Sequence, residues 1–175
     1  MFITQSLKRN VQLYPNKIAT GYHDRKFTWS QSIDRISKLA ASIKKLNIKI
    51  EDRVAILAHN SDRYFEILYS TSWSGGVFVP INTRLAPPEI EFWINDSESK
   101  IIFVDSNFSE IIKKNYLENK ISTVKEIIYI SEGKVPEGMI GYSDLITNDI
   151  AEDALRENDD LAGLFYTGGT TGRSK

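Results

Sequence analysis

The sequence predicts an α/β fold in which a doubly wound, mostly parallel sheet carries helices on both faces. From residue 53 onward, short apolar runs typical of buried strands alternate with segments whose apolar residues repeat at helical spacing. Capping residues, prolines and a glycine pair stand where these helices begin and end. With 175 residues, of which 41% are hydrophobic and 26% charged, the chain has ordinary globular composition and enough length for one core.

The N-terminal part precedes this alternation. Residues 2–13 place apolar side chains near helical spacing and stop before Pro15, which predicts a short docking helix. Residues 17–22 and 26–28 flank a polar turn and predict a short hairpin, with His23 near its tip. A histidine in that place is expected to be solvated.

The clearest helix in the sequence begins after Thr28. Thr28 and Gln31 have the spacing of a capping box, in which each residue satisfies a backbone N–H group of the first turn. Apolar residues then repeat every three or four positions, at Ile33, Ile36, Leu39, Ala40, Ile43 and Leu46. We expect this face to pack in the core.

Four apolar runs predict the strands of the sheet: residues 53–58, 77–80, 101–104 and 126–130. Between the first two, residues 60–62 supply N-cap side chains for a helix that ends at Gly75. Pro87 starts the next helix, and Asp105 and Ser106 are expected to cap a third one that runs to about residue 117.

The last third of the chain contains fewer helical signals. Residues 131–141, with a proline and three glycines, predict a surface loop. Residues 149–160 are rich in acids, which we interpret as solvated rather than as ligands for Mg²⁺. Residues 161–166 are mostly apolar and predict a buried strand.

The stretch after this strand, residues 167–175, carries the most chemistry. Gly168, Gly169 and Gly172 can adopt positive φ and expose backbone N–H groups, so that successive amides form an anion-binding nest. Hydroxyl donors come from Thr167, Thr170, Thr171 and Ser174, and positive charge comes from Arg173 and Lys175. This set of donors fits a polyphosphate at the end of a strand, where α/β folds bind ligands.

Other glycine-rich patterns fit these residues less well. Counted from Gly168, Arg173 stands where the second glycine of a Walker A loop belongs, and the dinucleotide pattern G-x-G-x-x-G is absent. The residues alone leave open a flexible linker or a hairpin tip.

Residues 166–175, Tyr-Thr-Gly-Gly-Thr-Thr-Gly-Arg-Ser-Lys, resemble the phosphate-loop signature of the AMP-forming adenylating superfamily. That superfamily comprises acyl- and aryl-CoA synthetases, nonribosomal peptide adenylation domains and luciferases. The resemblance implies a loop that wraps the β- and γ-phosphates of ATP while a carboxylate attacks the α-phosphate. The products are an acyl-adenylate and pyrophosphate, and thiolysis by coenzyme A usually follows.

The resemblance runs through most of the chain and implies how the domain is organised. Residues 1–175 are expected to be the N-terminal part of the adenylation domain, ending at the phosphate loop. The remainder of the large domain and the C-terminal domain are expected beyond Lys175, with the adenine site, the acyl pocket, the metal-binding acid and the catalytic C-terminal lysine.

The resemblance also implies roles, cofactors and partners. The nucleotide phosphates would contact Thr167, Gly168, Gly169, Thr170, Thr171, Gly172 and Ser174, while Arg173 and Lys175 would neutralise charge as pyrophosphate departs. ATP, Mg²⁺ and coenzyme A are expected to serve the complete enzyme. The chain alone is expected to be inactive and to associate with itself through apolar surface that the missing part would cover.

A second segment narrows the substrate class. Residues 79–85, Val-Pro-Ile-Asn-Thr-Arg-Leu, are explained by physics alone as a buried strand and a polar turn before a helix. They are also similar to a segment of fatty and other acyl-CoA ligases, whereas amino-acid-activating domains more often carry Pro-Leu-Asp-Pro there. Asn82 and Arg84 therefore favour a CoA ligase acting on a carboxylic acid, with a fatty acid as the expected substrate.

Three alternatives stay open at this point. The first is an amino-acid or aryl-acid adenylating enzyme. The second is a phosphate- or nucleotide-binding module without adenylation chemistry, and the third is an inert structural fragment.

Single residues outside these segments receive structural interpretations. His59 follows a buried strand, and we interpret it as a hydrogen-bonded histidine rather than as a catalytic base. Tyr64, Phe65, Tyr69 and Trp93 lie at helical spacing and are assigned to the core rather than to an acyl pocket.

Charge and composition argue against several other classes. A net charge of −1 provides no basic surface for nucleic acid, and two histidines without any cysteine make no zinc site by themselves. No apolar run approaches the roughly 18 residues of a membrane span, and the N-terminus lacks the apolar region of a signal peptide. The absence of cysteine fits a reducing compartment, and we expect a cytoplasmic protein.

Overall fold

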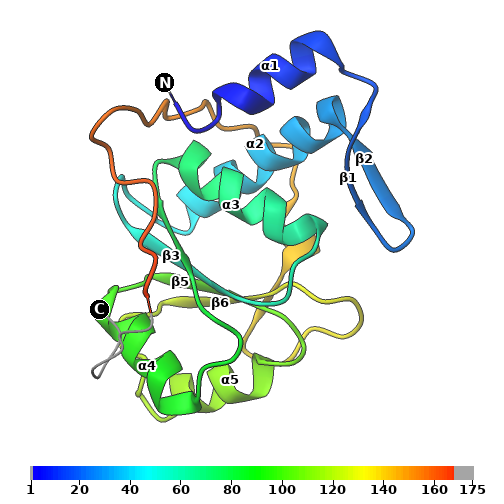
Figure 1. Ribbon diagram of the computed structural model, residues 1–175. Helices are drawn as coiled ribbons and strands as arrows, with labels where there is room; N and C mark the ends of the chain where they lie inside the picture. Colours follow the sequence, from blue (N-terminus) through cyan, green and yellow to red (C-terminus); the bar gives the residue numbers. More distant parts are fainter. Residues whose placement is uncertain (1, 168–175) are drawn as a thin grey trace.

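The computed structural model describes residues 2–167, and within them a parallel sheet forms the centre of the molecule (Figure 1). Its five strands are β3 (Arg53–Leu57), β4 (Val77–Pro80), β5 (Ile101–Val104), β6 (Glu126–Tyr129) and β7 (Ile140–Gly141). The spatial order is β4-β3-β5-β6-β7, and every neighbouring pair is parallel. The predicted mostly parallel sheet is therefore confirmed.

Helices cover both faces of this sheet (Figure 1). One face carries α2 (Trp29–Lys45) and α3 (Asp62–Ser74), and the other carries α4 (Pro87–Asp96) and α5 (Ser109–Leu117). Successive residues of β3 alternate between the two layers, because neighbouring side chains of a strand point to opposite faces. Val54 and Ile56 belong to the core beneath α2 and α3, while Ala55 and Leu57 belong to the core beneath α4 and α5.

The helix boundaries follow the capping signals. Thr28 Oγ1 accepts the Gln31 N–H at 3.3 Å, and the Gln31 side chain accepts the Thr28 N–H at 2.9 Å, so the capping box is formed. Ser61 caps α3 by accepting the Tyr64 N–H at 3.2 Å. Gly75 ends this helix with a φ of 93°, a conformation that favours glycine.

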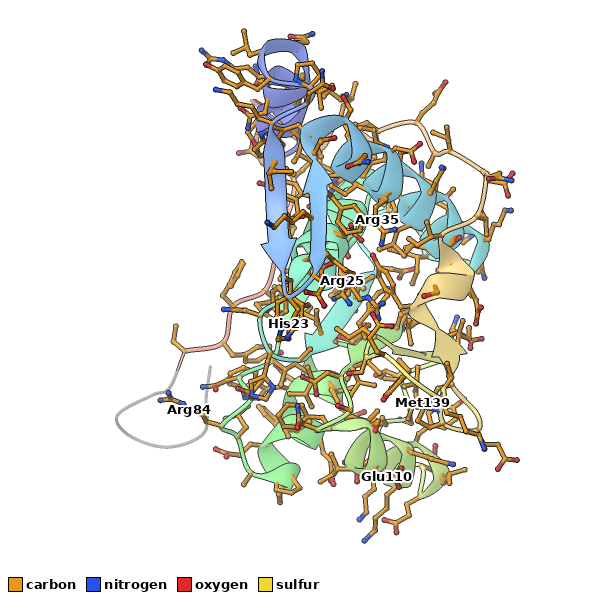
Figure 2. The ribbon with its side chains drawn as sticks, turned by 90° about the vertical axis from the view of Figure 1, so that its right-hand side faces the viewer. His23, Arg25, Arg35, Arg84, Glu110 and Met139 are labelled. Atoms are coloured by element: carbon orange, nitrogen blue, oxygen red, sulfur yellow. The ribbon has the colours of Figure 1, made fainter. Side chains whose placement is uncertain are left out.

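The N-terminal elements also match the sequence pattern. Helix α1 (Gln5–Leu13) buries Leu7 in a cluster with residues of α2. Strands β1 (Ile18–Tyr22) and β2 (Arg25–Thr28) form the predicted antiparallel hairpin, and Figure 2 shows His23 at its tip.

The predicted start of the third crossover helix is wrong. Helix α5 begins at Ser109 rather than after Asp105. The Asp105 carboxylate accepts the N–H groups of Asn107 at 2.9 Å and of His59 at 2.8 Å. Because this side chain closes its own turn and joins the ends of two strands, it is not available to cap the helix.

The predicted loop at residues 131–141 contains a strand that the sequence did not reveal. Strand β7 pairs Ile140 with Ile128 and Gly141 with Tyr129. A strand of two residues is too short to show the alternation of apolar and polar residues that indicates a strand. It forms because the edge of β6 offers backbone groups with which it can pair. A 3₁₀ helix, η1 (Tyr142–Leu145), follows directly and buries Tyr142 and Leu145.

Residues 161–166 do not form the predicted buried strand. Among the described residues they make a single parallel bridge, between Gly163 and Phe78 of the edge strand β4. Leu161 is 43% exposed and Phe165 is 66% exposed. The apolar composition alone predicts a buried strand. Within residues 2–167, however, the segment has a backbone partner on one side only, so it stays partly exposed.

Most acids of residues 149–160 are exposed, as expected, but Asp153 is packed against the N-terminal elements. Asp153 accepts a hydrogen bond from Thr4 at 2.6 Å and pairs with Lys8 at 2.7 Å, and its side chain is only 4% exposed. The Ala151 carbonyl accepts the Trp73 indole N–H at 2.9 Å. Residues 151–153 therefore bind α1 and α3 together, and among the acids of this segment the solvated interpretation is wrong only for Asp153.

Candidate functional site at the carboxyl edge of the sheet

The parallel strands place their carboxyl ends at one edge of the sheet, where α/β proteins bind ligands. Between the ends of β3 and β4 lies a hollow of about 300 Å³, which we call the β3–β4 hollow. It is lined by Ala58, Asn60, Tyr64, Pro80, Ile81, Asn82, Thr83, Trp93, Phe165 and Tyr166. The hollow thus brings together the residues that follow two strands and those that precede the predicted phosphate loop.

Tyr166 is the most firmly held of the residues next to that loop. Its ring stacks on Trp93 with the centroids 4.6 Å apart and the planes at 22°. Its hydroxyl donates to Asp96 Oδ2 at 2.6 Å. Burial, and then the neighbouring Asp96 carboxylate, raise the pKa of Tyr166 well above its ordinary value, so the hydroxyl keeps the proton that it donates.

The structure reaches the first residue of the predicted phosphate site and no further. Thr167 is exposed and directly follows Tyr166. Eight of the predicted site residues lie outside the described residues: Gly168, Gly169, Thr170, Thr171, Gly172, Arg173, Ser174 and Lys175. Their roles stay predictions.

The turn after β4 holds the second predicted pair. Asn82 Oδ1 accepts the Arg84 N–H at 3.0 Å, and the Asn82 carbonyl accepts the Leu85 N–H at 3.2 Å. Figure 2 shows Arg84 on the outside of the molecule, and in the chain this residue stands between β4 and α4. Its side chain is exposed and, among residues 2–167, its guanidinium pairs with no acid. A free cation at this edge is available to an anionic group of a substrate.

A second hollow, of about 360 Å³, lies at the ends of β3, β5 and β6. We call it the histidine hollow, because His23 and His59 both line it. His59 Nδ1 lies 3.0 Å from Asp105 Oδ2, which agrees with the interpretation of a hydrogen-bonded histidine.

The charges of the histidine hollow compensate one another. Arg25 binds both carboxylate oxygens of Asp62, each at 2.7 Å, and also pairs with Glu132. Arg63 pairs with the same Glu132. Burial alone would raise the pKa of the Asp62 carboxyl, but the hydrogen bonds and charge of Arg25 outweigh burial and lower it. This hollow therefore offers little uncompensated charge to a ligand.

Two kinds of site are missing from the part of the chain that the structure describes. No three histidine, aspartate or glutamate side chains within residues 2–167 are placed to hold a metal ion. No helix in the same range is both long and apolar enough to cross a membrane.

Similarity to known protein families shows which family this chain belongs to. Residues 7–175 match the family described as AMP-binding enzyme. The chain belongs to this family. The resemblance carried by residues 166–175 is thereby confirmed at the level of the family.

Relatives of this AMP-binding enzyme sequence include several CoA ligases. A peroxisomal butyrate–CoA ligase of Arabidopsis thaliana is 42% identical over 108 residues, which is 62% of this chain and 19% of the relative. A peroxisomal benzoate–CoA ligase of the same plant is 32% identical, over 97% of this chain and 32% of the relative. The chain thus spans about a third or less of the length of these relatives.

Solved structures show the same fold. The crystal structure of the anthranilate CoA ligase AuaEII in complex with anthranoyl-AMP superposes with a TM-score of 0.92 and 26% identity. It matches 99% of this chain and 33% of its own. The described part of this AMP-binding enzyme chain therefore has the architecture of a third of that CoA ligase.

The sequence pattern predicts a phosphate loop at residues 167–175, and it missed the side chains that hold Tyr166, the residue just before that loop. Trp93 was assigned to the core, and it is indeed buried, yet its face also stacks on Tyr166. Asp96 was not identified at all. The available signal was its position three residues after Trp93, which places both side chains on one face of a helix. Tyr64, also assigned to the core, packs edge-on against Phe78 and lines the β3–β4 hollow as well.

Proposed function

We propose that the complete enzyme containing this chain uses ATP to activate a carboxylic acid and then forms the coenzyme A thioester of that acid. The carboxylic acid that we propose is a fatty acid. The observation that carries this proposal is the position of the signature. Residues 167–175 directly follow Tyr166, which lines a hollow at the carboxyl edge of a parallel sheet in a chain of the AMP-binding enzyme family. Membership of the family and the named CoA ligases among the relatives support the same reading.

The first half-reaction is an attack at phosphorus. A carboxylate oxygen forms a bond to the α-phosphorus of ATP, the bond from that phosphorus to the bridging oxygen breaks, and pyrophosphate leaves with the bonding electrons. Amides of residues 168–172 and the hydroxyls of Thr167, Thr170 and Thr171 would bind the β- and γ-phosphate oxygens. Arg173 and Lys175 would neutralise the charge that accumulates on pyrophosphate, which is stabilisation specific to the transition state.

The second half-reaction forms the thioester. The thiol of coenzyme A loses its proton to solvent, its sulfur attacks the acyl carbon, and AMP leaves with the bonding electrons as the carbon–oxygen bond breaks. Coenzyme A is rich in phosphate, and the exposed guanidinium of Arg84, which pairs with no acid within residues 2–167, is a suitable partner for one of its phosphates. Mg²⁺ would supply charge neutralisation on the ATP phosphates, but no group within residues 2–167 is placed to hold it, so we assign no residue of this range to that role.

The acyl substrate has two candidate classes. Asn82 and Arg84 favour an acyl-CoA ligase, and a long-chain-fatty-acid–CoA ligase of Thermus thermophilus is 30% identical over 149 residues. An aryl acid is the second candidate, because a benzoate–CoA ligase and an anthranilate CoA ligase are also among the similar proteins.

The test is an exchange assay on the complete enzyme. Exchange of labelled pyrophosphate into ATP is measured with fatty acids of several lengths, benzoate, anthranilate and the common amino acids, followed by thioester formation with coenzyme A. We expect exchange and thioester formation with fatty acids. Exchange with amino acids only, or exchange without any thioester, would contradict the CoA ligase proposal. Nucleotide binding without exchange for any acid would favour a binding module.

A further inference from the structure

Tyr166 is held from two directions by α4. The face of its ring rests on Trp93, and its hydroxyl donates to Asp96 at 2.6 Å. Trp93 is buried, so its ring is itself fixed by the core. A side chain held at the face of its ring and at its hydroxyl can neither slide along the helix nor turn away from it.

The residues before Tyr166 are anchored to a different element. Phe78 of β4 donates its N–H to the Ala162 carbonyl at 3.1 Å and accepts the Leu164 N–H at 2.9 Å. Gly163 passes so close to the strand that a Cβ there would lie 2.9 Å from the Phe78 carbonyl oxygen. The backbone is thus bound to the sheet edge, and two residues later the Tyr166 side chain is bound to a helix.

The same helix connects to the turn that contains Arg84. Helix α4 begins at Pro87, two residues after Leu85 closes the Asn82 turn. Asn82 and Tyr166 line one hollow. One helix thereby supports both the residue before the predicted phosphate loop and the turn that we associate with coenzyme A.

We propose that Tyr166, held by Asp96 and Trp93, is a positioning residue that sets where the phosphate loop begins. This inference rests on the proposed function. The predicted loop consists of glycines, small hydroxyl residues and two cations, and fixing residues of this kind on a ligand costs conformational entropy. A fixed residue immediately before the loop reduces the number of arrangements that the loop has to give up when it binds ATP.

The two half-reactions distinguish this role from general stabilisation. Adenylation needs the loop, because the β- and γ-phosphates bind there until pyrophosphate leaves. Thioester formation from a supplied acyl-adenylate does not need it, because no pyrophosphate takes part. A positioning role therefore predicts damage to the first half-reaction alone.

The experiment uses the complete enzyme and the variant Tyr166→Phe, which keeps the stacked ring and removes the hydroxyl. With the best acid of the exchange panel, we expect kcat/KM for ATP to fall about tenfold, as for a lost hydrogen bond to a charged group. The rate of thioester formation from a synthetic acyl-adenylate and coenzyme A should equal that of the wild type. In Asp96→Asn the amide oxygen can still accept the hydrogen bond from the Tyr166 hydroxyl. Its kcat/KM for ATP should therefore fall less than that of Tyr166→Phe.

A double variant and a matched control complete the design. Tyr166→Phe combined with Asp96→Asn should be no worse than Tyr166→Phe alone, since both changes act on one hydrogen bond. Tyr116→Phe removes a hydroxyl that binds the Lys125 carbonyl and takes no part in holding Tyr166, so it should change neither half-reaction. Equal losses in both half-reactions for Tyr166→Phe, or no loss in either, would overturn the inference. A wild-type enzyme without exchange for any acid would instead refute the proposed function, and this inference with it.

Discussion

The hydroxyl of Tyr142 donates a hydrogen bond to the carboxylate of Glu66, 76 residues away in the chain. Both side chains are buried, and Arg35 binds the same carboxylate through two nitrogen atoms, at 2.6 and 3.0 Å. Figure 2 shows Arg35 on α2, next to the helix that carries Glu66. This group joins α2, α3 and η1, so the short η1 helix after β7 is bound to the helical layer by a charged acceptor.

We expect Tyr142→Phe to lower the free energy of unfolding by about 1.5–3 kcal/mol, because it removes a buried hydrogen bond to a charged group. Burial, and then the Glu66 charge, raise the pKa of Tyr142, so the hydroxyl carries the proton that it donates at neutral pH. Urea unfolding followed by tryptophan fluorescence measures the loss. Tyr116→Phe, at an exposed tyrosine, should cost less than about 0.5 kcal/mol. Equal stability of the two variants would show that the Tyr142 hydroxyl contributes nothing.

The Arg25–Asp62 pair predicts a pH-dependent stability. The folded pKa of Asp62 lies below its usual value near 3.8, so the pair stabilises the fold fully above that value. The contribution is lost as the pH falls from there through the lower, folded pKa. Arg25→Gln should therefore cost about 2 kcal/mol at pH 7, since it leaves a buried carboxylate without its partner, and progressively less as the pH falls and that carboxylate, whose pKa burial now raises, takes up a proton.

The control for this variant is Lys45→Gln, which breaks an exposed pair with Asp149. It should leave the free energy of unfolding almost unchanged at pH 7, because solvent screens an exposed pair. A pH-independent loss for Arg25→Gln would show that the Asp62 charge is not the cause.

Gly163→Ala tests the contact between residues 162–164 and the sheet. A Cβ at this position would lie 2.6 Å from a ring carbon of Phe165 and 2.9 Å from the Phe78 carbonyl oxygen. The exposed Phe165 ring can turn away, but the strand carbonyl cannot, so the segment has to separate from β4. We expect a loss of about 1–3 kcal/mol in unfolding free energy, together with slower pyrophosphate exchange. Gly21→Ala, whose Cβ would meet its nearest atom at 3.9 Å, should leave exchange unchanged, and equal exchange in both variants would contradict the contact.

Arg173→Ala and Lys175→Ala test the predicted phosphate loop in the complete enzyme. Each should lower kcat for adenylation by about 100-fold, because charge assistance matters most as pyrophosphate leaves. KM for ATP should change far less. Lys134→Ala removes an exposed lysine from the loop between β6 and β7 and should have no effect. Wild-type turnover in both loop variants would remove these residues from the mechanism.

The 175-residue chain expressed alone should make no acyl-adenylate and no thioester, because the resemblance assigns the adenine site and the acyl pocket to residues beyond Lys175. It should also form dimers or larger species through exposed apolar residues such as Phe165. Pyrophosphate exchange and the mass in solution measure the two expectations. Exchange by the chain alone would contradict the first, and a stable monomer would contradict the second.

Local signals in the sequence determined most of the architecture. Helices α2 and α3 begin and end where their capping signals predict: at the Thr28 capping box, at the Ser61 cap and at Gly75. These signals can be recognised in the sequence because a cap and its partner lie within a few residues of each other. Short apolar runs located β3 to β6, and their alternation with helices predicted parallel pairing. The glycine-rich signature, read by resemblance, indicated the family before any contact was known.

Tertiary structure decided the features that depend on distant partners. Asp105 binds His59 rather than capping a helix, Asp153 is buried against α1, and Tyr166 meets Asp96 across 70 residues of sequence. Each outcome depends on which groups the folded chain brings within hydrogen-bonding distance, and periodicity or capping patterns contain no such information. A polar side chain in a sequence has several possible partners, and only the packed sheet and helices select one of them.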